Sequence, residues 1–107
     1  QGIGQALTEH VVYDTDGQLL TATFMDYGMP RADDMPFIAF STEPVPSTAN
    51  PLGMKGCGEA GTVGALAAVA NGVLDALWPL GVREVDMPFT PARVWGYLGD
   101  RAAMAAE

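Results

Sequence analysis

The chain has 107 residues and a mass of 11.2 kDa, so it can hold one hydrophobic core and a single domain. Thirteen acidic residues against five basic ones give a net charge of −8, and Lys55 is the one lysine. Such a chain lacks the basic surface that would neutralise nucleic-acid phosphates or bind an anionic membrane, so we expect neither as a partner.

Cysteine and histidine are too few for several kinds of site. One Cys and one His cannot by themselves form a disulfide, a Cys/His zinc site or an iron–sulfur cluster. We therefore expect no metal held by side chains of this chain, and a reducing compartment, the cytoplasm.

The first part of the chain predicts a short helix followed by a β-hairpin. Residues 2–10 place apolar side chains on one side at helical spacing. Residues 11–13 and 18–24 have strand character and flank the turn signal Asp14–Gly17, which is typical of a hairpin. After an irregular loop, residues 37–43 predict a further strand.

The second part predicts two helices and one more strand. From about Gly61 or Thr62 to Leu77 the apolar residues recur at intervals of three and four, which indicates a buried core helix. The helical part of this apolar stretch is expected to be too short to span a bilayer. Residues 82–88 predict a strand, and residues 90–98 a helix with Thr90 as N-cap and Pro91 in first position. The predicted fold class is α+β: a mixed sheet with a hairpin and two to three helices.

The stretch KGCGEAGTVG, residues 55–64, contains the spacing G-x-G-x-x-G before the long helix. A dinucleotide-binding fingerprint needs a buried strand leading into the first glycine, whereas here three prolines precede it, and a P-loop would need a Lys-Ser/Thr pair. Two interpretations of Glu59 remain open. It complements the helix dipole, a gain of about 0.3–1 kcal/mol, or the glycines around it leave room for a cofactor to approach the backbone.

The residues also resemble a known family. KGCGEAGTVGALAAVANGVLDAL, preceded by NPLGM and followed by VDMPFTPARVW, resembles the C-terminal segment of the molybdenum-binding large subunit of the molybdenum hydroxylases. This family includes xanthine dehydrogenase, aldehyde oxidoreductases and aerobic carbon monoxide dehydrogenase. Residues 1–36 resemble an upstream part of the same subunit, most like the carbon monoxide dehydrogenase type. Residues 1–107 are thus expected to be a single-domain C-terminal fragment of a larger molybdopterin-binding subunit.

The resemblance implies a site and a chemistry. It places the general base on Glu59, a hydrogen bond to the pterin cofactor on Gln1, and backbone contacts with the cofactor on Gly2, Cys57 and Gly58. The implied cofactor is molybdopterin with molybdenum, in its cytosine dinucleotide form, with the metal held by the pterin dithiolene. The implied reaction oxidises an aldehyde, an N-heterocycle or a carbon monoxide-like substrate with a water-derived oxygen, whose proton a nearby carboxylate can accept.

The resemblance also implies partners. These are the remainder of the large subunit, an iron–sulfur small subunit, an FAD medium subunit and a small-molecule substrate. Alone, the fragment is expected to be inactive, to bind no cofactor tightly, and to self-associate or expose an apolar patch. The alternative hypothesis is a small non-enzymatic binding or interaction module with a glycine-rich helix start.

Overall fold

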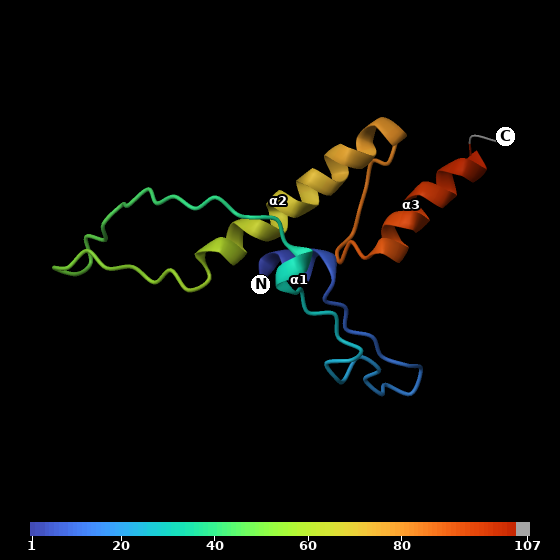
Figure 1. The fold of residues 1–107 in the computed structure, drawn as a ribbon, viewed down its shortest axis with the longest axis horizontal. Helices are drawn as coiled ribbons and strands as arrows, with labels where there is room; N and C mark the ends of the chain where they lie inside the picture. Colours follow the sequence, from blue (N-terminus) through green and yellow to red (C-terminus); the bar gives the residue numbers. More distant parts are fainter. Residues whose placement is uncertain (105–107) are drawn as a thin grey trace.

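The computed structural model of the chain describes residues 1–104. Over this range the elements are α1 (Gly2–Leu7), η1 (Ala32–Asp34), α2 (Ala60–Leu77), η2 (Trp78–Leu80) and α3 (Pro91–Met104), where η denotes a 3-10 turn. Two long irregular segments, residues 8–31 and 35–59, extend away from the helices in different directions (Figure 1).

The predicted mixed sheet with a hairpin is wrong. Within residues 1–104 there is no strand, and the expected hairpin is reduced to one antiparallel bridge between Tyr13 and Leu19. The turn itself forms as predicted, because Asp14 Oδ1 accepts the N–H groups of Asp16 and Gln18 at 2.9 and 2.8 Å. A two-stranded ribbon is marginally stable without a third strand or a helix to cover it. In Figure 1 this loop extends free of the helices, so nothing here supports longer pairing.

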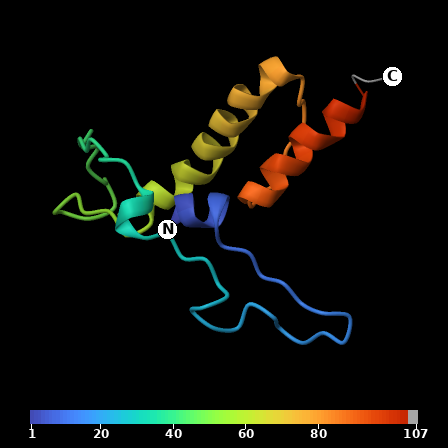
Figure 2. The same cartoon turned by 45° about the vertical axis from the view of Figure 1, so that its right-hand side comes forward.

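The other two predicted strands are also absent from the described part of the chain. Residues 37–43 run without regular structure, and Phe37 and Phe40 are 98% and 86% exposed. Residues 82–88 lead back from the end of α2 to the start of α3, so that α2 and α3 point the same way in both views (Figures 1 and 2). Both segments contain apolar residues that fit a strand, but residues 1–104 contain no strand with which either could pair.

Close packing of α1 against the start of α2 positions the N-terminal residues. A Cβ on Gly2 would lie 2.7 Å from the Cβ of Ala65 and 3.0 Å from the carbonyl oxygen of Thr62. Only a residue without a side chain permits this approach. Ala6, on the same helix, is fully buried.

The long helix forms close to its predicted bounds, and its buried face differs partly from the predicted one. Leu77 is buried and Leu66, Ala70, Val73 and Leu74 are half-buried. Val63 and Ala67, expected on the same face, are exposed, Val63 by 79%. The covered stripe is instead completed by Ala65 and Val69, because α1 packs on that side near the start of the helix.

The buried hydrophobic residues are few and lie in two places. Leu77 and Val82 meet at the end of α2, where the Val82 N–H donates a 3.3 Å hydrogen bond to the Leu77 carbonyl oxygen. Ala6 of α1 and Phe89 meet near the start of α3. The Phe89 N–H donates a 2.7 Å hydrogen bond to the Ala6 carbonyl oxygen, which holds the returning segment on α1. At the start of α3 the Thr90 Oγ1 accepts the N–H of Arg93 at 3.4 Å, so the predicted N-cap is confirmed.

The chain exposes much more surface to solvent than a compact monomer of its size. The accessible surface is 8602 Å², whereas a compact monomer of this mass would expose about 5,700 Å². The radius of gyration is 18.5 Å, against about 13 Å for a compact domain of this length. Exposed apolar side chains of the two long irregular segments, among them Phe24, Met25, Phe37 and Phe40, are part of this uncovered surface.

Helix α2 and the turn after it, Ala60–Leu80, form a segment of 21 residues that is long and apolar enough to cross a membrane by length and composition. This corrects the expectation that the helical part is too short. Core helices of soluble proteins meet the same criteria, so the observation is weak evidence for a span.

Candidate functional site

Glu59 occupies the N-cap position of α2 without capping the helix through its side chain. Its backbone carbonyl oxygen accepts the N–H of Val63 at 3.2 Å, while its carboxylate makes no capping hydrogen bond. Asp, Asn, Ser and Thr are the residues whose side chains commonly cap a helix in this position, because they are short enough to reach the first N–H groups. The Glu59 carboxylate is therefore not engaged by the N–H groups of its own helix.

The hydrogen bond that the carboxylate makes joins two residues that the family resemblance assigns to the same site. Gln1 Nε2 donates a hydrogen bond to Glu59 Oε1 at 3.3 Å, although 58 positions separate the residues and both are exposed. The packing of Gly2 on α2 brings Gln1 to the start of that helix. The candidate base and the candidate cofactor ligand thus lie side by side.

Cavities lie on two sides of the glycine loop. One, of about 440 Å³, has Gln1, Gly2, Gly58, Gly61 and Thr62 in its wall. The other, of about 530 Å³, is lined by Cys57 together with Glu43, Lys55 and Gly56. Gln1, Gly2 and Gly58 therefore share one cavity, whereas Cys57, an exposed free thiol, faces the neighbouring one.

The loop backbone is open to approach. Apart from chain neighbours and, at Gly61, the backbone of α2 itself, no atom of the described chain lies within 4 Å of the position that a Cβ would take at Gly56, Gly58 or Gly61. None of these three glycines has a positive φ that would require it for the turn. The space above the loop is therefore not needed by the fold of this chain, which fits a site that admits a bulky group.

Comparison with known proteins identifies the family of the chain. Residues 1–36 match the family described as the molybdopterin cofactor-binding domain. Over 96 residues, the chain is 45% identical to the 6-hydroxypseudooxynicotine dehydrogenase complex subunit gamma of Paenarthrobacter nicotinovorans, a match that covers 89% of this chain and 12% of the relative. The chain belongs to the molybdenum hydroxylase family.

Solved structures of molybdenum hydroxylases support the same assignment. Quinoline 2-oxidoreductase from Pseudomonas putida 86 is 44% identical with a TM-score of 0.87, and the match covers 94% of this chain and 13% of that one. The Cu,Mo-CO dehydrogenase is 31% identical with a TM-score of 0.86, over 94% of this chain and 13% of that one. The chain thus spans about an eighth of the length of these relatives. Because the relatives are oxidoreductases, they favour the enzyme hypothesis over the binding module.

A second polar contact, which no sequence pattern predicts, lies after α1. The Tyr27 hydroxyl donates a 2.6 Å hydrogen bond to Glu9 Oε2. This bond, then burial and then the negative charge of Glu9 raise the pKa of Tyr27 above its ordinary value. No local sequence pattern links residues 18 positions apart in an irregular loop, so no signal was available to predict the pair.

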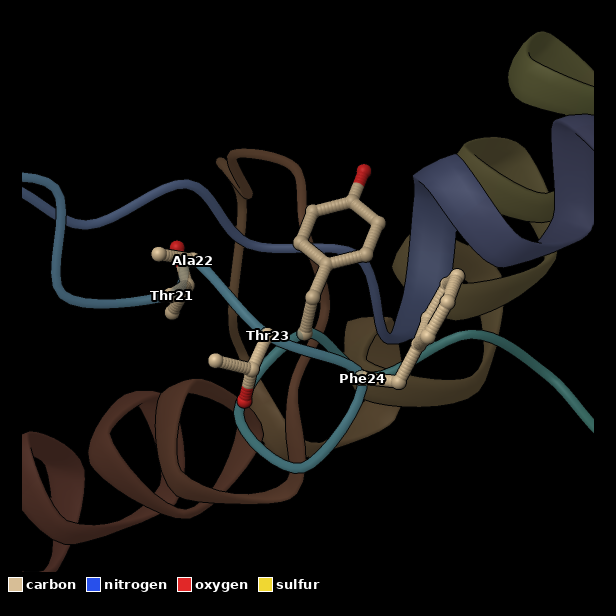
Figure 3. Close-up of a pocket in the computed structure, with 5 residues that line it drawn as sticks. Thr21, Ala22, Thr23 and Phe24 are labelled. Atoms are coloured by element: carbon tan, nitrogen blue, oxygen red, sulfur yellow. The ribbon is translucent and has the colours of Figure 1, made fainter.

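Tyr27 also lines a cavity of about 360 Å³ that is separate from the Glu59 site. Figure 3 shows its wall, formed by consecutive residues of one loop, Thr21, Ala22, Thr23 and Phe24. None of the predicted site residues of the molybdenum hydroxylase resemblance lines it. Throughout residues 1–104, no three His, Cys, Asp or Glu side chains are grouped closely enough to hold a metal ion.

Proposed function

We propose that this chain forms one wall of the active site in the large subunit of a molybdenum hydroxylase. The whole enzyme would oxidise a small molecule, an aldehyde, an N-heterocycle or a carbon monoxide-like compound, with an oxygen atom derived from water. The observation that carries the proposal is the contact between Gln1 Nε2 and Glu59 Oε1 beside a glycine loop open to a ligand. If Glu59 only complemented the helix dipole, there would be no reason for a glutamine 58 positions away to hydrogen-bond its carboxylate.

Glu59 is the proposed general base. A base must reach the proton that it accepts, and Glu59 is exposed. Its hydrogen-bond partner Gln1 and its neighbour Gly58 line the cavity of about 440 Å³. Its carboxylate is an acceptor with two oxygen atoms, of which Oε1 holds the bond to Gln1. The carboxylate can therefore be held in place and still receive a proton.

The residues present fit molybdopterin, which we propose in its cytosine dinucleotide form. Gln1 has two amide N–H donors, so it can bind the cofactor while it also contacts Glu59. Gly2 and the backbone of Cys57 and Gly58 would line the cofactor, and the missing side chains at Gly56, Gly58 and Gly61 leave it room. When bound, the cofactor would supply the molybdenum that activates the water-derived oxygen and accepts electrons from the substrate.

The proposed setting is a cytoplasmic multi-subunit enzyme. Its other parts would be the rest of the large subunit, an iron–sulfur small subunit and an FAD medium subunit. The name of one relative, subunit gamma of a dehydrogenase complex, supports such an assembly. Because this chain supplies one wall of the cavity, we expect the fragment alone to be inactive and to bind no molybdopterin tightly.

The test uses Glu59→Gln in the full-length enzyme. This change keeps the shape and the hydrogen-bonding capacity but removes the proton acceptor, so turnover should fall by about 10²- to 10⁴-fold with molybdenum content unchanged. The matched control is Glu84→Gln, which alters an exposed glutamate outside the cavity walls described above. Wild-type turnover in a fully metallated Glu59→Gln enzyme would refute the proposed function.

A further inference from the structure

We propose that Gln1 is a positioning residue for Glu59 in addition to contacting the cofactor. Its amide would hold Oε1 of the carboxylate and leave Oε2 as the atom that receives the proton. This inference rests on the proposed function, because it matters only if Glu59 is the base.

The contact pattern of Glu59 supports this role. Within residues 1–104, Gln1 is the one side chain that hydrogen-bonds the Glu59 carboxylate. The glutamate is exposed, does not cap its helix, and has glycines at positions 58 and 61 that offer no side chain to pack against. A glutamate side chain has three rotatable bonds and gives up much rotamer freedom when it is held in one geometry. A single donor whose backbone is held beside the carboxylate therefore restricts where the carboxylate lies.

The place of the donor is set by helix packing rather than by a loop. Gln1 directly precedes α1, and its carbonyl oxygen accepts the N–H of Gln5 at 3.0 Å, which joins it to the first turn. The next residue, Gly2, is buried against Thr62 and Ala65 of α2. Because Glu59 is the N-cap residue of the same α2, both ends of the hydrogen bond are attached to one pair of packed helices. At 3.3 Å the bond is long, which suits an orienting contact better than a strong one.

A double-mutant cycle in the full-length enzyme tests the inference. Gln1→Met keeps the length of the side chain and removes both donors, and we expect turnover per molybdenum atom to fall about 10-fold, the effect of one ordinary hydrogen bond. In the Glu59→Gln background the same change should have no further effect, because the base through which Gln1 acts is already gone. Gln5→Ala, in the same helix and exposed, is the matched control and should leave turnover unchanged.

Two further measurements separate positioning from cofactor retention and from misfolding. Molybdenum content shows how far Gln1→Met weakens cofactor binding, and normalising turnover to it removes that effect. A crystal structure of the Gln1→Met enzyme should show the Glu59 carboxylate displaced from its wild-type position or spread over several.

The outcomes distinguish this inference from the proposed function. The positioning role is refuted if Gln1→Met lowers turnover per molybdenum atom equally in the wild-type and Glu59→Gln backgrounds. It is also refuted if Gln1→Met leaves the Glu59 carboxylate in place. Neither result contradicts the role of Glu59 as general base. If Glu59→Gln alone retains wild-type turnover, the proposed function fails and the inference fails with it. Should Gln1→Met not fold, Gln1→Asn, which keeps the amide but shortens its reach, completes the same cycle.

Discussion

The Tyr27 hydroxyl lies 2.6 Å from Glu9 Oε2 and ties the irregular loop 8–31 back to the segment that follows α1. A hydrogen bond from the neutral phenol to a carboxylate favours the protonated tyrosine, which is why the pKa of Tyr27 is raised above 10.0. This contact stabilises the loop as long as the phenol keeps its proton. Its contribution is therefore present below about pH 10 and is lost as the pH rises through the folded-state pKa.

This pair gives a first prediction, measured by the absorbance of ionised tyrosine in a pH titration of the chain. The wild-type titration should contain a component above pH 10 that is missing in Tyr27→Phe. In Glu9→Gln the same component should move to lower pH, since the negative charge and its strong acceptor are gone. Tyr13→Phe, which removes an exposed tyrosine, is the control and should leave that component in place. Identical titrations of the wild type and Glu9→Gln would contradict the assignment.

The second prediction contrasts two phenylalanines. Phe89 is 4% exposed, and truncating such a side chain to alanine costs about 3–5 kcal/mol of unfolding free energy. Phe37 is 98% exposed, so Phe37→Ala should change the unfolding free energy of the isolated chain by less than about 0.5 kcal/mol. Urea denaturation of both variants measures the difference.

The same pair tests whether the rest of the large subunit covers the exposed apolar surface. In the full-length enzyme Phe37→Ala should become destabilising by an amount that approaches the Phe89→Ala value. Equal and negligible effects of Phe37→Ala in both settings would show that this side chain stays exposed.

The third prediction compares two glycines. Gly2→Ala would place a methyl group 2.7 Å from the Cβ of Ala65, and overpacking of this kind costs about 1–3 kcal/mol. Gly56→Ala meets open space, so it should leave the stability of the chain unchanged yet lower the molybdenum content of the full-length enzyme, if the cofactor approaches the loop there. Denaturation and metal analysis of the two variants should therefore give opposite patterns. A Gly56→Ala enzyme with full metal content would argue against close approach at that glycine.

The fourth prediction concerns association of the isolated chain. Its surface of 8602 Å² leaves Phe24, Met25, Phe37 and Phe40 each at least 86% exposed. Large apolar side chains exposed to this degree favour association, because burying them against another copy removes apolar surface from water. Sedimentation should show dimers or larger species, or a hydrophobic dye should bind with strong fluorescence. A strictly monomeric chain that binds no dye would refute this expectation.

The helices could be predicted from the sequence because their signals are local. The apolar spacing of α2 and the Thr90–Pro91 pair before α3 depend on neighbours within one or two turns. The strands could not, because apolar and aromatic composition shows only that a segment fits a sheet, and pairing depends on other strands. Residues 37–43 have that composition and no partner strand in residues 1–104.

The candidate site could likewise be predicted only in part from the sequence. Glycine spacing drew attention to Glu59, but no periodicity connects Gln1 to it across 58 positions. Only the resemblance to the molybdenum hydroxylases placed both residues in one site, and the structure brings them into contact. The roles of Glu59 as base and of Gln1, Gly2, Cys57 and Gly58 as cofactor contacts stay predictions. The separation of Cys57 and Gly58 between two cavities could not have been foreseen, because it depends on the path of residues 43–53.

The contact between Gln1 and Glu59 also constrains the order in which the chain folds. Helix α2 can begin to form from local interactions, but the two halves of the candidate site meet only when a loop of 58 positions closes. Loop closure has an entropic cost that rises by about 0.6 kcal/mol for each doubling of length, and it must be met before the contacts of α1 with α2 repay it. The site therefore assembles after its own helix, and a chain in which α1 has not yet docked would present Glu59 without the amide beside it.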